Sequence, residues 1–192
     1  MALSPRGREV YFRRLLEIDG RVTTLKTQKA HARRPEPPRS ELLLQLHLES
    51  NPEALCLVRA TLQRVAEVVH FQEHESRAIV RSVDEALANI IRHAYRGRSG
   101  MPIEVSCWRL WDGKDDETVT GIEIVLSDSG AAADVEKLKG RSLDDIRPGG
   151  LGLHFIKQSM DVVEFSRKRG KNFLRLVKFL TVPRQDGSRE GE

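Results

Sequence analysis

The sequence predicts an α+β fold: a two-layer α/β sandwich whose helices pack on one face of a mixed, mainly antiparallel sheet. Two observations support this prediction. Apolar residues recur at helical spacing in two long segments between residues 52 and 96, whereas the other apolar segments have the length of strands. Residues 103–111 and 118–126 are two such strands, and the acidic, glycine-containing link 112–117 between them is typical of a hairpin.

The first half of the domain is predicted to contain one strand and two helices. Residues 41–48 form an apolar segment of strand length. A helix over residues 52–71 follows, and Pro52 suits its first turn because the missing N–H has no partner there in any case. The second helix extends from about residue 73 to residue 95 or 96 and ends before Gly97.

The second half is predicted to contain a long loop, a helix and two strands after the hairpin. Residues 128–150 have weak periodicity and are rich in Asp, Gly, Ala and Lys. A loop of this length inside a compact domain often carries a functional site. A helix over residues 151–160 and strands over 162–166 and 173–181 complete the domain.

Charge divides the chain into an arm, a domain and a tail. Residues 1–39 contain ten Lys or Arg and four Asp or Glu, whereas residues 40–192 contain 22 and 24. We therefore predict a basic, partly disordered arm over 1–39, a domain over 40–182 that is long enough for a sizeable core, and a polar tail over 183–192.

Several functions remain open for the arm. Apolar residues at helical spacing between Val10 and Ile18 predict a short amphipathic helix, and the basic, proline-rich residues 26–39 favour extended chain. The arm is interpreted as a solvated linker or as a segment that docks on another protein. Contact with nucleic acid and a targeting function are the alternatives.

Composition excludes some classes of protein. No apolar run approaches the roughly 18 residues of a membrane-spanning helix, so no membrane association is expected. Cys56 and Cys107 form neither a disulfide framework nor a zinc cluster, and we expect both to be small buried residues in a reducing cytoplasm.

The second helix carries a row of polar residues that could take part in catalysis or bind a metal ion. Glu85, Asn89 and His93 lie at i, i+4 and i+8, which places them on one face of an α-helix. A solvated polar face is the plain alternative. Against it, Asn has poor helix propensity, so Glu, Lys or Gln would suit a merely solvated position better. Glu can act as a general base, and the amide oxygen of Asn can bind Mg²⁺.

Asp128-Ser129-Gly130 closes an apolar strand and is a candidate ligand-binding turn. The Asp128 carboxylate can accept a hydrogen bond from an exocyclic amine such as that of adenine, and Gly130 allows close approach of a ligand to the backbone. An ordinary turn is the alternative, because Asp, Ser and Gly are common turn residues.

A glycine-rich segment precedes the third predicted helix. Pro148-Gly149-Gly150-Leu151-Gly152-Leu153 exposes backbone N–H groups at a helix N-terminus, which attracts anions; a flexible linker is the alternative. The segment lacks the Lys-Ser/Thr of a phosphate-binding P-loop, and no strand precedes it as in a dinucleotide-binding motif.

In this order, the three motifs resemble those of the Bergerat-fold ATPases, whose domain is histidine-kinase-like. Within that group the chain looks most like the bacterial anti-sigma-factor serine/threonine kinases. The resemblance covers roughly residues 40–181. It rests on Val83-Asp84-Glu85-Ala86-Leu87-Ala88-Asn89 with His93-Ala94-Tyr95, on Asp128-x-Gly130, and on Gly149-Gly150-Leu151-Gly152-Leu153.

The resemblance implies a site for ATP and Mg²⁺ between the Asn89 helix and a flexible lid. Asn89 would bind the Mg²⁺ that bridges the phosphates, and Glu85 would be the catalytic base. Arg92 would contact a phosphate, and His93 would orient Asn89 or pack beside the lid. The remaining ATP-binding residues would be Asp128 and Gly130 at the adenine, and Gly149, Gly150, Leu151, Gly152 and Leu153 at the phosphates.

Two departures from the family pattern concern the adenine pocket. Ala131-Ala132-Ala133 stands where many relatives have another glycine, which predicts a stiffer or differently shaped pocket. Asn172 lies near the place where many relatives have a threonine on the last strand, and it either supplies that polar contact or the contact is lost.

The resemblance further implies a cytoplasmic regulator that sequesters a sigma factor and phosphorylates Ser or Thr of an antagonist protein. Direct binding to nucleic acid is not expected of this domain, and a homodimer is an expectation of the family only. A non-catalytic ATP-sensing binding module and a detached histidine-kinase catalytic domain are the two alternatives.

Overall fold

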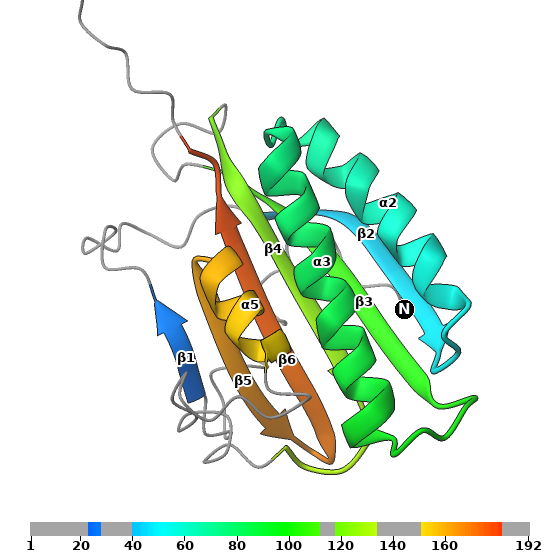
Figure 1. The fold of residues 1–192 in the computed structure, drawn as a ribbon. Coiled ribbons are helices and arrows are strands. Elements are labelled where there is room, and N and C mark those ends of the chain that lie inside the picture. The colour runs from blue at the N-terminus through cyan, green and yellow to red at the C-terminus, as the bar shows by residue number, and fades with distance from the viewer. Residues whose placement is uncertain (1–22, 28–39, 112–117, 134–150, 182–192) are drawn as a thin grey trace, which may run out of the picture.

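The computed structural model describes residues 23–27, 40–111, 118–133 and 151–181. They form a six-stranded sheet, ordered β1-β5-β6-β4-β3-β2, with helices on one face (Figure 1). The strands are β1 (Thr23–Thr27), β2 (Ser40–Glu49), β3 (Pro102–Trp111), β4 (Val119–Asp128), β5 (Val162–Lys168) and β6 (Lys171–Phe179). The helices are α2 (Ala54–Val68), α3 (Glu73–Asn89), the π-helix η2 (Ile90–Ala94) and α5 (Leu151–Ser159). The predicted two-layer α+β fold is confirmed.

Every strand pair in the described sheet is antiparallel. The prediction of a mainly antiparallel sheet is therefore confirmed, but the described part of the sheet contains no parallel pair and is not mixed. The predicted hairpin accounts for part of this pattern, since β3 pairs with β4, and the next two strands, β5 and β6, also pair with each other. The turn between β5 and β6 is tight because Arg169 and Gly170 both adopt positive φ angles, of 47° and 81°. β6 then returns beside β4 and places Asn172 opposite Asp128.

Residues 23–27 form an edge strand that was not predicted. β1 pairs with β5, from Thr23 opposite Phe165 to Thr27 opposite Val162. Part of the basic arm therefore belongs to the sheet. The predicted helix between Val10 and Ile18 lies outside the described residues, as do residues 28–39, 112–117 and 183–192.

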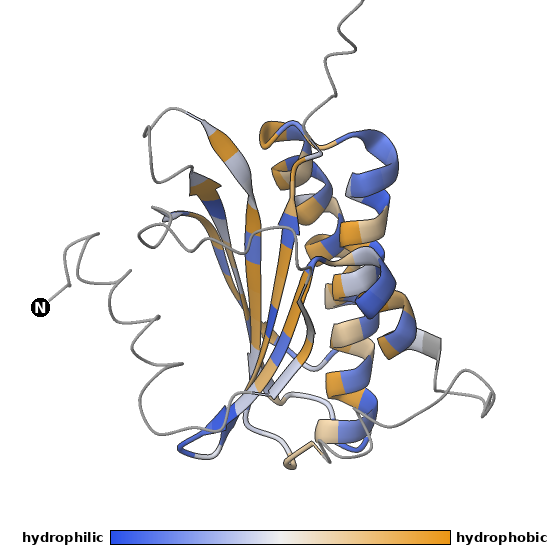
Figure 2. Cartoon of the chain, turned by 90° about the vertical axis from the view of Figure 1, so that its left-hand side faces the viewer, coloured by the Kyte–Doolittle hydropathy of each residue, from blue (hydrophilic) through white to orange (hydrophobic). Residues whose placement is uncertain are grey.

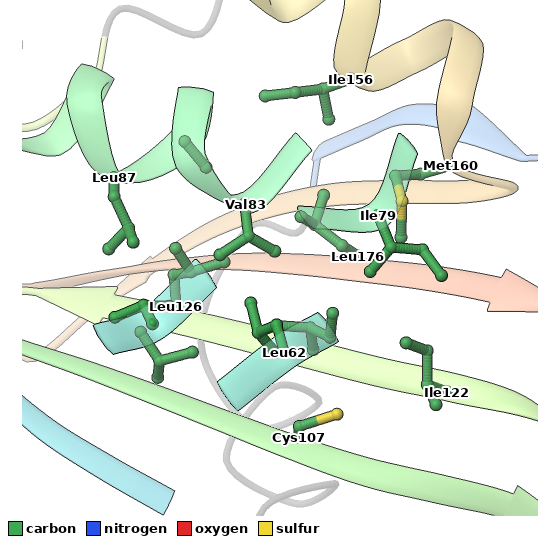
Figure 3. Packing of buried hydrophobic residues seen from close by; sticks show 14 of the residues in the cluster. Leu62, Ile79, Val83, Leu87, Cys107, Ile122, Leu126, Ile156, Met160 and Leu176 are labelled. Carbon is green, nitrogen blue, oxygen red and sulfur yellow. The ribbon is translucent and has the colours of Figure 1, made fainter. Parts of the chain in front are cut away.

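The main core lies between the sheet and the helix layer (Figure 3). Alternate residues of the central strands point toward the helices, because side chains alternate across a sheet. The core residues labelled in Figure 3 are Leu62, Ile79, Val83, Leu87, Cys107, Ile122, Leu126, Ile156, Met160 and Leu176. None of the described helices is long and apolar enough to cross a membrane.

The two cysteines differ in their surroundings. Cys107 is buried in the core, and burial raises the pKa of its thiol to about 12, so the thiol is neutral and unreactive. Cys56 is exposed on α2, so the prediction that both cysteines are buried is wrong for Cys56. Its neighbour Leu55 fills the inward position of that helix instead.

Helix α3 is anchored at its start and changes geometry near its end. At the start, the Glu75 carboxylate accepts hydrogen bonds from the Gln72 backbone N–H (3.1 Å) and from the Thr181 hydroxyl (2.7 Å). At the other end, the α-helix continues as the π-helix η2 and stops at Arg96 and Gly97, whose φ angles are 54° and 75°. The predicted helix end is confirmed, but the π-turn before it was not predicted.

Candidate functional site

The loop after β4 packs against the end of η2. The backbone N–H of Ala131 donates to the carbonyl oxygen of Ala94 (2.9 Å). A Cβ added at Gly130 would lie 2.6 Å from the carbonyl carbon and oxygen of Ala94, so only glycine fits. Gly130 is therefore required by the approach of the protein's own backbone, whereas the sequence suggested the approach of a ligand.

The Tyr95 side chain holds the same loop through hydrogen bonds of its hydroxyl group. Its side chain is fully buried, and its hydroxyl donates to the Pro102 carbonyl oxygen and accepts from the Ser129 backbone N–H (2.9 Å). Burial raises the pKa of the hydroxyl, which therefore stays protonated at neutral pH. Tyr95 thus connects η2, the start of β3 and the loop after β4.

Asp128 lies buried at the end of β4. Its Oδ1 atom accepts hydrogen bonds from the Gly130 backbone N–H and from Asn172 Nδ2, both at 2.8 Å. Burial raises the pKa of this carboxyl group, while the two hydrogen bonds and nearby Arg167 oppose that shift. These contacts hold the carboxylate in one orientation.

Asn172 and Arg167 extend this arrangement across β6 and β5. Asn172 Nδ2 also donates to the Ala131 carbonyl oxygen (3.0 Å), and Arg167 donates to the Asn172 side-chain oxygen. Arg167 Nη1 also donates to the Gly130 carbonyl oxygen (3.0 Å). Asn172 therefore contacts the Asp128 carboxylate, the group expected to bind the adenine amino group. Sequence reasoning missed Arg167, because only the pairing of β5 with β6 brings it here.

A cavity of about 510 Å³ opens beside this loop. Such a volume is within the range of small-molecule sites. The lining residues are Ala94, Arg96, Arg98, Ser129, Gly130 and Ala131. The two arginines give its rim positive charge, which suits an anionic ligand.

Glu85 lies against the first turn of α5. A Cβ added at Gly152 would lie 1.9 Å from Glu85 Oε1, so the carboxylate occupies the space that any other residue would need. Glu85 Oε1 is also 3.7 Å from Arg92 Nη2. Both side chains are partly exposed, at 30% for Glu85 and 55% for Arg92, so the carboxylate is accessible to a reactant.

A second cavity, of about 320 Å³, lies between α3 and α5 and includes Glu85 and Gly152. Its remaining lining residues are Arg81, His154, Phe155 and Gln158. The Arg81 guanidinium lies 4.2 Å from the centre of the Phe155 ring, a cation–π contact that closes one wall. Neither Asn89 nor Asp128 lines this cavity or the first one.

The π-turn alters the predicted row of polar residues. The Tyr95 backbone N–H donates to the Ile90 carbonyl oxygen, five residues earlier, so the i, i+4 spacing does not continue beyond Asn89. His93 is exposed and makes no hydrogen bond to Asn89 in the described part of the chain. Asn89 is half-buried at the junction of the α- and π-helices.

The structure thus brings Glu85, Arg92 and Gly152 together, and separately Asp128 and Gly130. Gly149 and Gly150 lie outside the described residues, as does the Leu151 side chain, and Leu153 is half-buried on α5.

Comparison with known proteins places this arrangement in a family. The model of the histidine kinase-like ATPase domain matches residues 48–178. The chain is 27% identical to a protein of Bacillus pumilus named serine-protein kinase RsbW, over 75% of this chain and 90% of the relative. It is similarly 27% identical to the RsbW of Staphylococcus epidermidis, over 71% and 86%, and 28% identical to that of Listeria innocua, over 66% and 81%.

A solved structure shares the fold. It contains the RsbU and RsbW domains of Rv1364c from Mycobacterium tuberculosis and superposes with a TM-score of 0.51 at 18% sequence identity, covering 73% of this chain. The matched region covers 33% of the length of that longer chain. Because the family model covers more than half of the sequence, the chain belongs to the histidine kinase-like ATPase domain family, as its three motifs predicted.

Proposed function

We propose that the chain is an ATP-dependent protein serine/threonine kinase that sequesters a sigma factor and phosphorylates an antagonist of that sequestration. The observation that carries the proposal is the position of Glu85, a partly exposed carboxylate beside Gly152 in the first turn of α5. Helix N-termini bind phosphate groups, so this carboxylate lies beside the place where a γ-phosphate would be held. The relatives named serine-protein kinase support the same activity.

In the proposed reaction Glu85 is the general base. Its carboxylate takes the proton from a Ser or Thr hydroxyl while the hydroxyl oxygen attacks the γ-phosphorus of ATP. The bond between the γ-phosphorus and the bridging oxygen breaks, and ADP leaves with the bond's electron pair. Arg92, whose Nη2 atom lies 3.7 Å from Glu85 Oε1, can neutralise phosphate charge beside the base.

ATP and Mg²⁺ fit the residues present. The half-buried Asn89 side chain makes no hydrogen bond with another described residue, so its amide oxygen is available as a neutral, hard ligand of the kind that Mg²⁺ prefers. Bound there, Mg²⁺ would neutralise phosphate charge. The buried Asp128 carboxylate, held by Gly130 and Asn172, would accept the adenine amino group.

The proposed protein partners are a sigma factor and its antagonist, both of which would be met in the cytoplasm.

Incubation with γ-labelled ATP and candidate antagonists tests the kinase activity. The proposal requires label on a Ser or Thr of one antagonist and loss of that label in the Glu85→Gln variant. A pure ATP sensor would bind ATP and switch partners equally well as the Glu85→Gln variant, without labelling any protein.

A further inference from the structure

The face of the sheet opposite the helices is buried at its centre. Among the described residues, four buried apolar side chains do not belong to the main core cluster: Leu110, Val125, Phe173 and Val177. Their exposed fractions are 5%, 2%, 8% and 1%. Since all of the described helices lie on the other side of the sheet (Figure 2), these helices cannot be what buries them.

Strand alternation places these four side chains on the open face. Ile124 and Leu126 of β4 belong to the main core, so Val125 between them points the other way. Leu176 of β6 is likewise in the core, which turns Val177 outward. Phe173 shares this direction with Val177, and Leu110 lies three positions beyond the core residue Cys107 of β3.

The open face also carries a charged group. Arg175 of β6 bridges Glu123 of β4 and Glu164 of β5, with Nη–Oε distances of 2.7 and 2.9 Å. The three side chains are only 20% to 26% exposed. Two carboxylates share one guanidinium, so the group keeps one negative charge and favours a cationic cover.

Composition identifies the segment that can supply this cover. Residues 28–39 and 112–117 contain no large apolar side chain, and residues 182–192 contain only Val182. Residues 134–150 do contain large apolar side chains, but the described parts on either side of them belong to the helix side, since the loop after β4 contacts η2 and α5 packs against α3. Residues 1–22 remain. They lead directly into β1 at the sheet edge and hold five arginines against three acidic residues.

We propose that residues 10–18 form an amphipathic helix that packs on the open face of the sheet and makes a third layer. Tyr11, Leu15 and Ile18 recur at i, i+4 and i+7, and Phe12 with Leu16 widens the same apolar stripe. Arg13 and Glu17 lie on the opposite side of such a helix and stay in solvent. The arm is then a structural element of the domain, on the side away from the candidate nucleotide site.

Tryptophan fluorescence tests the proposal in the full-length chain. Trp108 lies opposite Glu123 and shares its open face, and replacing the other tryptophan by Trp111→Phe leaves Trp108 as the reporter. In this background, Phe12→Gln with Leu15→Gln should at least double the iodide quenching constant of Trp108 and shift its emission to longer wavelength. The control pair Arg13→Gln and Glu17→Gln introduces the same residues on the other side and should change neither.

Circular dichroism and Mg·ATP binding verify that each variant is folded. A variant lacking residues 1–22 should show the same increase in Trp108 quenching as the variant with Phe12→Gln and Leu15→Gln. Unchanged quenching in both the pair and the truncated chain would overturn the proposal. So would quenching that responds to protein concentration but not to truncation, because a second copy of the chain would then cover the face. If the pair unfolds while its control stays folded, hydrogen exchange of the truncated chain decides: the proposal requires faster exchange in β4 and β6 than in α3.

Discussion

The Glu85 carboxylate fills the space that a side chain at position 152 would occupy: a Cβ on Gly152 would lie 1.9 Å from Oε1 and 2.2 Å from Cδ. These two residues are 67 positions apart in the sequence, on α3 and α5. Their contact joins the proposed catalytic base to the helix turn that would receive phosphate. The glycine is therefore needed for the position of the base as well as for access to the backbone.

The Gly152→Ala variant should lose activity without losing its fold. The three atoms nearest to the added methyl group all belong to the Glu85 side chain, which is partly exposed and can turn away, so the melting temperature should change little. Displacing the base by about 1 Å should lower the rate of phosphoryl transfer by about 100-fold. Steady-state transfer assays together with thermal unfolding check this.

The double variant Glu85→Gln with Gly152→Ala is the matched control for that effect. If Gly152 acts through the position of Glu85, the alanine should cause no further loss once the base is gone. An equal loss in both backgrounds would mean that Gly152 serves the phosphates through its own backbone.

The Asn89→Ala variant should lose the Mg²⁺-dependent part of ATP affinity. Removing one ligand to a charged centre costs about 1.5–3 kcal/mol, or about 10- to 100-fold in affinity. His93→Ala is the comparison, because His93 is exposed within the π-helix η2 and its loss should change the affinity less than threefold. Calorimetric titration with ATP, with and without Mg²⁺, separates the two. Equal losses of affinity in both variants would contradict this account and would support the prediction that Glu85, Asn89 and His93 act together on one face of the helix.

The Asp128→Asn variant should be at least as stable as the wild type but bind ATP poorly. Burial raises the pKa of Asp128, so the folded state holds this proton more tightly than the unfolded state. The ionised carboxylate therefore lowers stability as pH rises from about 4 through the raised pKa, and the loss persists at neutral pH. The asparagine oxygen can still accept from Gly130 and Asn172, but its amide cannot accept from adenine.

Thermal unfolding at neutral pH and below pH 4 checks the sign of this effect. The variant's gain in melting temperature over the wild type should be larger at neutral pH than in acid. The opposite result would be a variant whose melting temperature, compared with that of the wild type, is lower at neutral pH than in acid. That result would show that the ionised carboxylate stabilises the fold.

Most of the fold followed from local patterns. The β3–β4 hairpin, the apolar stripe of α3 and the end of the helix at Gly97 depend on residues close together in the sequence, and the structure has them near the predicted positions. β1 was missed because Thr23–Thr27 is short and polar and lies between basic segments. Pairing with β5 stabilises it, and no local pattern reports such a contact.

The candidate site was predictable as residue types but not as geometry. Asp128 and Gly130 were identified, yet the reason for glycine at 130 is the backbone of Ala94, which only the tertiary fold brings near. Arg167 depends in the same way on strand pairing. The π-turn was not predicted because no local residue pattern reports the hydrogen bond from the Tyr95 backbone N–H to the Ile90 carbonyl oxygen, five residues earlier.

Transfer of labelled phosphate by wild type and by the Glu85→Gln variant tests the central claim most directly. Both proteins should bind Mg·ATP with similar affinity, since the amide has nearly the same shape as the carboxylate. The wild type should label a Ser or Thr of an antagonist protein, and the variant should do so about 100- to 10,000-fold more slowly, because it has lost its general base. Equal labelling by the two proteins, or no labelling by a wild type that binds ATP, would contradict the account.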